Sequence, residues 1–381
     1  MNDFIYSYPT KVYFGNEATK KAFSSELKNM GNTVMLAYGC KSAKQNGVYN
    51  EIYDYLKDAG KEIVDFGGIM PNPTYKKVQE GAKLAREKQV DFILAVGGGS
   101  VIDCCKIISA QALCDKDIWE MEFKDHVFPS DFIPMGAIVT ASGTGAEMNN
   151  GAVITNEDVN EKAGVWGAHV NFAILNPEYT MSLPEKQVIS GAFDTLSHCM
   201  ETYFGFPTEV NVSDEIAEVV MRNTIRNIRI LKKDLYDKQA RSELMWDSAM
   251  GENGILKIGK VTDFQVHQIE HQLGAFTDCN HGQGLAVIQP VYCYHILNDA
   301  REKLTRFAQV VFDQKTAEEG LEALQNFIKE CHLPTTLPEL KSKVEITNDL
   351  LKKVADTTNL IKTNPRTLTK EEVYDILLEC M

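Results

Sequence analysis

The chain has 381 residues, of which 44% are hydrophobic and 24% are charged, as is typical of a soluble globular protein. Its formal net charge of -14 argues against a nucleic-acid partner, because an acidic surface repels phosphate backbones and the sequence shows no obvious basic patch. No apolar run approaches the roughly 18 residues of a membrane span, and the N-terminus lacks a basic region followed by an apolar core. We therefore expect a cytoplasmic protein with neither a nucleic-acid nor a membrane partner.

The nine cysteines are scattered and mostly lie within apolar segments. No Cys-x-x-Cys pair is present, so neither a zinc ribbon nor a dithiol redox motif is indicated. We expect buried free thiols.

From about residue 33 the sequence alternates short apolar runs with longer amphipathic ones. The predicted strands are Val34–Tyr38, Glu62–Phe66, Phe92–Val96, Met135–Val139 and Phe172–Leu175. The predicted helices between them are Val48–Ala59, Tyr75–Lys88 and Val101–Leu113. This alternation predicts a parallel sheet covered by helices on both faces.

After the Asn176-Pro177 break, strand-like runs disappear and nearly every segment has a helical period. The predicted helices are Glu185–Phe204, Asp214–Leu231, Ser242–Leu256, Gln265–Leu273 and Glu318–Cys331. Pro184 suits the first turn of a helix, so we place the boundary there. The sequence therefore predicts an α/β domain at residues 1–183 and an all-α domain at residues 184–381.

Two loops that follow predicted strands have the composition of a phosphate-binding site. Gly97-Gly98-Gly99-Ser100 joins a strand to a helix, where glycines let a ligand approach the backbone and the helix start offers unpaired N–H groups. The segment 140–147 follows the next strand and supplies the hydroxyls of Thr140, Ser142 and Thr144. Ligands of open parallel sheets bind outside the carboxyl ends of the strands, so the two loops predict a dinucleotide site. The alternative for each loop is a tight turn without a ligand.

The end of the first strand bears on the choice between NAD and NADP. The segment Tyr38-Gly39-Cys40-Lys41-Ser42-Ala43-Lys44 contains no acidic residue. An NAD-selective site usually has an acid there for the ribose 2′-hydroxyl, whereas an NADP site has small, hydroxyl or basic groups. Lys41, Ser42 and Lys44 therefore favour NADP, although an ordinary solvated loop would have the same composition.

Asp194 and His198 stand four residues apart in a predicted helix and therefore on one face of it. A later segment contains His267, His271 and His281. One carboxylate with several imidazoles suits zinc or ferrous iron. Spacing alone does not distinguish which of the three later histidines would be ligands, and unrelated core or surface histidines are the alternative.

These motifs together resemble those of the iron-containing alcohol dehydrogenase family. The resemblance rests on Gly-Gly-Gly-Ser-x-x-Asp-x-x-Lys at residues 97–106, the loop at 140–147, Asp194-x-x-x-His198 with Glu201, and the segment from His267 to His281. It covers nearly the whole chain. The chain is most similar to the branch of butanol dehydrogenases and NADPH-dependent aldehyde reductases.

The resemblance implies an N-terminal dinucleotide-binding domain and a C-terminal domain that holds one divalent metal ion, iron or zinc. The implied metal ligands are Asp194, His198, His267 and His281. The implied cofactor-binding positions are Gly39, Lys41, Ser42, Gly98, Gly99, Ser100, Asp103, Thr140, Ser142, Thr144 and Lys162. His271 would line the site near the substrate and is the candidate proton relay.

The resemblance also favours NADP(H) over NAD(H), because relatives that prefer NAD carry an aspartate where this chain has Gly39. Cys40 and Lys41 nevertheless replace two glycines that are common in this branch. This departure leaves NAD(H) as the alternative cofactor.

The expected function is therefore a metal-dependent alcohol dehydrogenase or aldehyde reductase for small aliphatic alcohols and aldehydes such as butanol and butanal. The metal would polarise the carbonyl oxygen while the reduced nicotinamide supplies hydride. Phe264, Leu273 and Phe276 could form an apolar wall of the site, or could simply pack between helices. A homodimer is expected from the resemblance.

Two other functions are weighed against this one. An NAD-dependent glycerol-type polyol dehydrogenase of the same fold is disfavoured by the missing acid after the first strand. A metal-dependent phosphohydrolase would need an adjacent His-Asp pair, which the sequence lacks.

Overall fold

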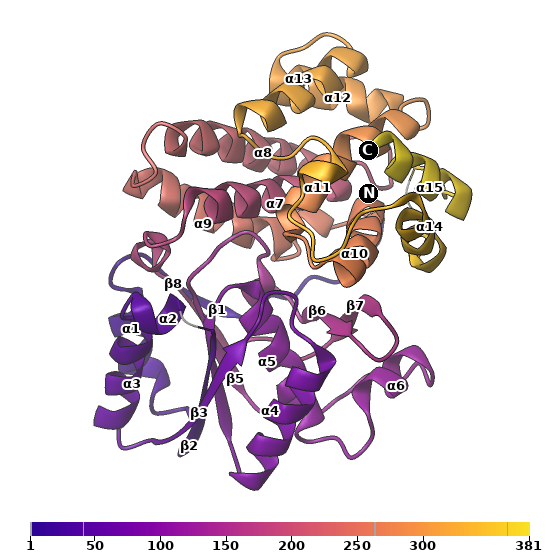
Figure 1. The fold of residues 1–381 in the computed structure, drawn as a ribbon. Coiled ribbons are helices and arrows are strands. Elements are labelled where there is room, and N and C mark those ends of the chain that lie inside the picture. The colour runs from indigo at the N-terminus through magenta and orange to yellow at the C-terminus, as the bar shows by residue number, and fades with distance from the viewer. Residues whose placement is uncertain (1, 41, 263, 364) are drawn as a thin grey trace. The chain divides into compact units, whose positions relative to one another are not determined.

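The computed structural model describes residues 2–40, 42–262, 264–363 and 365–381. The chain divides into two compact units, one formed by Tyr8–Leu183 and the other by Pro184–Met381 together with the N-terminal segment up to Ser7. The first unit is α/β and the second is helical (Figure 1). The predicted fold class is therefore confirmed. None of the described helices combines the length and the apolar character needed to span a membrane.

The α/β unit is built on a six-stranded parallel sheet with the strand order β1-β8-β5-β4-β2-β3. Its strands are β1 (Lys11–Phe14), β2 (Thr33–Gly39), β3 (Glu62–Ile69), β4 (Phe92–Gly97), β5 (Met135–Val139) and β8 (Phe172–Leu175). β4, β5 and β8 are buried along their whole length, as expected of strands covered on both faces. The five predicted strands are confirmed, and β1 adds an edge strand that the apolar pattern does not predict.

Helices cover both faces of this sheet. The helices of this unit are α1 (Ala18–Glu26), α2 (Ser42–Gln45), α3 (Val48–Asp58), α4 (Tyr75–Glu87), α5 (Gly99–Gln111) and α6 (Ile118–Phe123). α1 and α3 pack on one face through a core that includes Phe23, Ile52 and Leu94. α4 and α5 cover the opposite face (Figure 1). The predicted helices that correspond to α3, α4 and α5 are confirmed, with ends that differ by at most two residues.

A two-stranded antiparallel hairpin, β6 (Gly151–Asn156) and β7 (Glu161–Trp166), lies outside the main sheet. It was not predicted from the sequence. Asp103 of α5 accepts a hydrogen bond from Val153 N at 3.0 Å, and the buried Lys106 Nζ donates to Gly151 O at 2.6 Å. These two α5 side chains therefore fasten the hairpin to the sheet layer.

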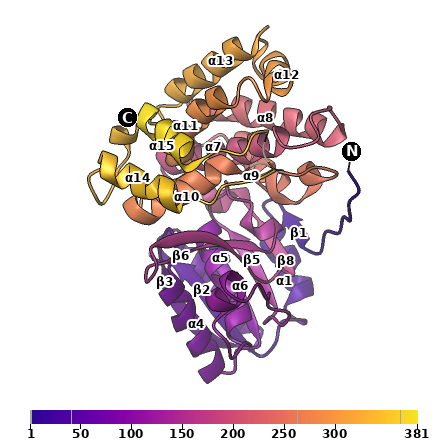
Figure 2. The same cartoon turned by 90° about the vertical axis from the view of Figure 1, so that its right-hand side faces the viewer.

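The helical unit is arranged around a central helix. Its helices are α7 (Glu185–Tyr203), α8 (Val212–Leu231), α9 (Lys238–Glu252), α10 (Gln265–Thr277), α11 (His281–His295), α12 (Arg301–Phe312), α13 (Ala317–Glu330), α14 (Asn348–Thr357) and α15 (Lys370–Glu379). α7 is buried along nearly its whole length and contacts α8, α9 and α11. α10, α14 and α15 form a neighbouring layer (Figure 2). The five helices predicted for this half are present as α7, α8, α9, α10 and α13, but α9 begins and ends four residues before the predicted Ser242–Leu256.

The N-terminal segment packs with the helical unit. Asn2 N donates a hydrogen bond to Gly259 O at 3.1 Å, and the Tyr6 ring lies beside Gly254. The expected domain at residues 1–183 included this segment, so the structure differs from that expectation in the first seven residues. The binding roles expected of the two domains stay predictions.

Candidate metal centre and nucleotide loops

Four polar side chains from three helices converge in the helical unit. α7 presents Asp194 and His198 one turn apart, α10 presents His267, and α11 begins with His281. Asp194 Oδ1 lies 3.6 Å from His198 Nε2, and 3.5 Å from each Nε2 of His267 and His281. The structure therefore brings together the carboxylate and three of the four imidazoles that the sequence singles out.

The facing atoms of this cluster fit a metal ion. Asp194 Oδ1 and His267 Nε2 are buried and have no hydrogen-bond partner among the described residues, and such atoms are costly to leave unpaired. A tetrahedral ion with bonds of about 2.1 Å separates its ligands by about 3.4 Å. The observed 3.5 and 3.6 Å are close to this value. One oxygen and three imidazole nitrogens suit iron or zinc.

The charges of the cluster favour a cation. Burial raises the pKa of the Asp194 carboxyl, but His198, His281 and His267 outweigh this effect and hold the pKa at about 2. Burial lowers the pKa of the His267 imidazole, but Glu201 and Asp194 outweigh it and raise the pKa to about 10. The carboxylates that favour a proton on His267 would equally favour a divalent cation in its place.

A second buried carboxylate orients His267. Glu201 lies one turn after His198 on α7 and is completely buried. It accepts a hydrogen bond from Val266 N at 2.6 Å and contacts His267 Nδ1. Because Glu201 occupies Nδ1, the Nε2 atom of His267 is the one directed at Asp194.

His281 has an equivalent partner in Glu270. This glutamate of α10 is completely buried and contacts His281 Nδ1, which leaves Nε2 for Asp194. The sequence interpretation did not include Glu270 among the site residues, and it quoted Glu201 only as part of a motif. The available signal is spacing, since each glutamate follows a histidine of the cluster by three residues and so shares its helix face.

Gly282 allows the third helix to reach the cluster. A Cβ at this position would lie 2.0 Å from Ser190 O of α7. Only a residue without a side chain therefore lets the start of α11 approach α7 this closely. This approach places His281 against Asp194.

His271 lies one turn after His267 on α10. Its ring centroid is 6.2 Å from that of His267 and 5.6 Å from that of His281. With Glu270 and His281 it forms a second group whose ligand atoms lie within 4.8 Å of one another. We favour the group that contains Asp194, because Glu270 already contacts His281 Nδ1 whereas Asp194 Oδ1 has no hydrogen-bond partner among the described residues.

The apolar residues expected near the cluster differ in their surroundings. The Phe264 ring centroid lies 5.1 Å from that of His267 and 5.8 Å from that of His198, so this side chain borders the site. Leu273 is completely buried, which agrees with the alternative of helix packing. Phe276 is half-buried.

In the α/β unit the two predicted loops touch each other. Gly98 is the N-cap of α5, and Thr140 N donates to Gly97 O at 2.9 Å where β5 leaves the sheet beside β4. A Cβ at Gly99 would lie 2.3 Å from Thr144 Oγ1. Gly98, Gly99 and the start of α5 therefore lie directly beside the hydroxyl-bearing segment of the second loop.

The remaining candidate cofactor residues occupy three places. Gly39 ends β2, the other neighbour of β4, at the point where the strand order reverses and ligands of such sheets bind. Ser42 begins α2, and Lys41 lies outside the described residues. Asp103 and Lys162 are buried on α5 and β7.

Loops of this type on a parallel sheet, together with a metal-type cluster in a helical unit, define the class of nucleotide-using, metal-dependent enzymes. Residues 9–177 match the family model described as iron-containing alcohol dehydrogenase. Residues 188–381 match the model of the C-terminal part of the same family. The chain therefore belongs to the iron-containing alcohol dehydrogenase family.

Individual relatives cover nearly the whole chain. It is 36% identical to NADH-dependent butanol dehydrogenase A of Clostridium acetobutylicum over 91% of this chain and 92% of that protein. It is 33% identical to NADPH-dependent aldehyde reductase YqhD of Escherichia coli over 93% of this chain and 94% of that protein. The solved structure of NADH-dependent butanol dehydrogenase A from Thermotoga maritima has a TM-score of 0.94 and 32% identity, over 100% of this chain and 99% of that one.

Family membership defines the coarse chemistry. The protein is an oxidoreductase of the alcohol dehydrogenase type, acting on CH–OH groups, and its family implies a nicotinamide cofactor and a divalent metal. The relatives' names include both NADH and NADPH, so they do not distinguish between the two cofactors.

Proposed function

We propose that this protein interconverts small aliphatic aldehydes and alcohols, using NADP(H) and one divalent ion held by Asp194, His198, His267 and His281. The observation that carries this proposal is the convergence of buried Asp194 Oδ1 with three Nε2 atoms at 3.5 to 3.6 Å. A divalent ion bound there would supply Lewis acidity towards the oxygen of the substrate. A reduced nicotinamide would supply the hydride.

The chain's own residues would prepare this chemistry. Glu201 and Glu270 hold two imidazoles in the orientation that exposes Nε2. The loops at 97–100 and 140–147 would hold the diphosphate of the cofactor through backbone N–H groups and hydroxyls. His271, beside the rings of His267 and His281, would pass a proton to the product oxygen.

The preference for NADP(H) is supported at the end of β2. The chain has Gly39 where an acid would favour NAD, and Lys44 follows in the same segment. Lys44 Nζ lies 4.5 Å and 4.4 Å from the ring centroids of Tyr38 and Tyr49, so a cation is held near this strand end. The neighbouring acid, Asp65, lies 4.0 Å from Lys44 Nζ and also accepts a hydrogen bond from Tyr38 at 2.7 Å.

One assay tests the proposal. Chelator-treated protein is reloaded with ferrous or zinc ion, and oxidation of NADPH or NADH by butanal is followed by the absorbance of the reduced nicotinamide, alongside metal analysis. We expect turnover only after reloading, and faster turnover with NADPH. The variant His281→Ala should lose both metal and turnover, whereas His271→Ala should keep its metal and turn over more slowly.

Each arm of this assay can contradict one part of the proposal. Faster turnover with NADH would refute the cofactor preference. Undiminished turnover by the chelator-stripped protein would refute the metal requirement. Full metal content in His281→Ala would refute the ligand set.

A further inference from the structure

One face of α8 carries an unusual concentration of positive charge. No acidic residue occurs between Glu218 and Asp234, although Asp and Glu together make up 53 of the 381 residues. The same stretch contains Arg222, Arg226, Arg229, Lys232 and Lys233. The expectation that this acidic chain has no basic patch is therefore wrong.

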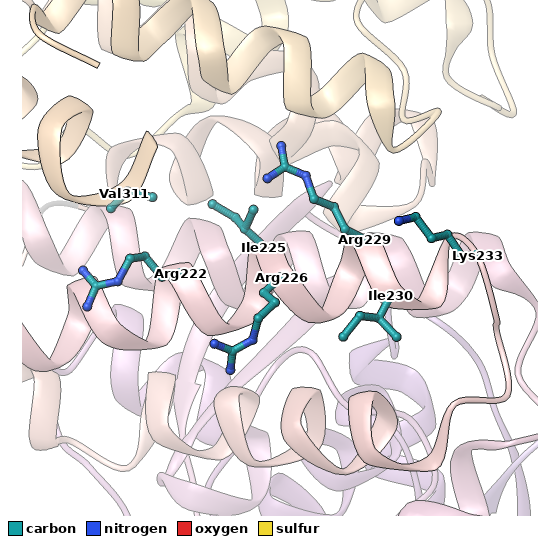
Figure 3. A pocket seen from close by; sticks show the side chains of 7 residues that line it. All are labelled: Arg222, Ile225, Arg226, Arg229, Ile230, Lys233 and Val311. Carbon is teal, nitrogen blue, oxygen red and sulfur yellow. The ribbon is translucent and has the colours of Figure 1, made fainter. Parts of the chain in front are cut away.

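Four of these cations lie along a groove. Arg222, Arg226 and Arg229 follow the spacing i, i+4 and i+7, which places them on one side of α8 over about 10 Å, and Lys233 lies in the turn just after the helix ends at Leu231. All four are exposed. Together with Ile225, Ile230 and, on α12, Val311, they line a groove of about 410 Å³ (Figure 3).

Most of this charge is not neutralised within the part of the chain that the structure describes. Arg229 forms a bidentate ion pair with Glu330, in which Nε and Nη2 lie 2.8 and 2.9 Å from the two carboxylate oxygens. Among the described residues, the Arg222 side chain donates a hydrogen bond only to Val310 O, at 3.4 Å, and the Arg226 side chain donates to the Asn223 side chain. Neither they nor Lys233 forms an ion pair with any described residue.

Two acids lie near this face, and Arg226 interacts electrostatically with one of them, Asp247, without forming an ion pair with it among the described residues. Glu243 and Asp247 of α9 both accept hydrogen bonds from Asn223, and Asp247 is buried. Like charges three or four residues apart on a helix destabilise it by about 0.2 to 0.5 kcal/mol per pair. The basic face therefore carries a cost that an anionic ligand would offset.

We propose that this groove binds a small anion that carries two or more phosphate groups. The planar guanidinium groups of Arg222 and Arg226 can each donate two hydrogen bonds to the oxygens of one phosphate, and Lys233 adds a flexible positive charge. Ile225, Ile230 and Val311 offer an apolar floor to an organic body attached to the phosphates. The volume of about 410 Å³ falls within the usual range for small-ligand sites.

A small ligand fits the charge of the whole molecule better than a macromolecule does. The net charge of -14 repels a long polyanion over its full length, whereas a compact ligand experiences mainly the local cations. Inorganic oligophosphate and a nucleoside triphosphate share the required chemistry. They differ in whether the apolar floor contributes.

The test is calorimetric titration of the full-length protein with tripolyphosphate, ATP, AMP and a single-stranded oligonucleotide in low salt without magnesium. The test variant carries Arg222→Gln, Arg226→Gln and Lys233→Gln. The matched control carries Lys186→Gln, Lys341→Gln and Lys353→Gln, which removes the same charge from exposed positions of the same unit outside the groove. Turnover of butanal is measured for both variants.

We expect saturable binding of tripolyphosphate and ATP, at least tenfold weaker in the test variant and within twofold of the parent in the control. Butanal turnover should be unchanged in both, so the result does not depend on the proposed function. Equal affinities for tripolyphosphate and ATP would show that the groove recognises only the phosphates. Tighter binding of ATP would show that the nucleoside also contributes to binding. The proposal is overturned if binding is absent, if AMP binds as tightly as ATP, if the two variants weaken binding equally, or if the oligonucleotide binds more tightly than ATP.

Discussion

At the scale of single residues, two carboxylates support the cluster around Asp194 without being candidate ligands themselves. Glu201 and Glu270 each contact the Nδ1 atom of a candidate ligand, and both are completely buried. Such partners fix the tautomer and the ring orientation of a metal-binding histidine. Their contribution to metal affinity can therefore be measured separately from that of the ligands.

Replacing Glu201 by Gln should weaken metal binding by about 10- to 100-fold, because the neutral amide no longer holds His267 with Nε2 facing Asp194. The measurement is competition with a chromophoric chelator. Glu218→Gln is the control, since Glu218 is also buried but interacts with Tyr203 and Arg306 instead. The role assigned to Glu201 would be refuted if both variants bound metal like the parent.

A second residue-scale prediction concerns pH. Burial raises the pKa of the Asp247 carboxyl to about 7, despite hydrogen bonds from Asn223 and Thr224. An unfolded Asp ionises near pH 4. Between these values the folded state keeps a proton that the unfolded state has released, so this residue makes stability fall as pH rises from about 4 to about 7, with no further change above that range.

Asp247→Asn should therefore flatten the pH dependence of the free energy of unfolding. From pH 5 to pH 8 the parent should lose roughly 2 kcal/mol more than the variant. Urea titration at the two pH values measures the difference. Parallel pH profiles of parent and variant would show that Asp247 titrates normally.

At the scale of elements, the position of α11 is set by a close approach to α7. A Cβ at Gly282 would meet backbone atoms of Ser190, which cannot rotate away as a side chain could. Gly282→Ala should therefore push the start of α11 outward and move His281 away from Asp194. We expect metal affinity to fall at least tenfold.

Gly251→Ala is the control for this prediction, because Gly251 of α9 also faces α7 but a Cβ there would meet nothing closer than 3.8 Å. Alanine favours a helix over glycine by about 1 kcal/mol, so this variant should keep its metal affinity and gain stability. If chelator competition gave both glycine variants the same affinity, the close approach of α11 would not determine the site.

The elements differ in how well the sequence predicts them. β5 and β8 are predicted residue for residue, because strands buried on both faces show as unbroken apolar runs. The β6–β7 hairpin is not, since its alternating apolar and polar residues and internal glycine give a weak pattern. α11 contains Gly282, Gly284 and Pro290, residues of low helix propensity, and tertiary packing overrides them.

The sequence predicts the candidate site only in part. The pair Asp194 and His198 is predictable because helical spacing alone puts them on one face. His267 and His271 lie four residues apart and share one face of α10, so no local sequence pattern shows which of them would be the metal ligand. Only the folded position of α10 beside α7, with Glu201 on Nδ1, brings Nε2 of His267 to Asp194 Oδ1.

At the scale of the whole molecule, metal binding should stabilise the protein. An ion that binds only the folded state at 100 times its dissociation constant contributes about 2.7 kcal/mol. Calorimetry should show that zinc or ferrous ion raises the melting temperature of the parent, whereas Asp194→Asn should show a much smaller rise. Magnesium, which prefers oxygen ligands, is the control ion. An equal rise in parent and variant would place the binding elsewhere.

The contact of Gly99 with Thr144 has a consequence for how the nucleotide loops can change. Since Thr144 fills the space that a side chain at position 99 would need, enlarging one residue requires shrinking the other. The two turns are more than forty positions apart in the chain, yet the side chains that each can carry are sterically coupled. A redesign of cofactor preference that alters either turn must treat both as a single object.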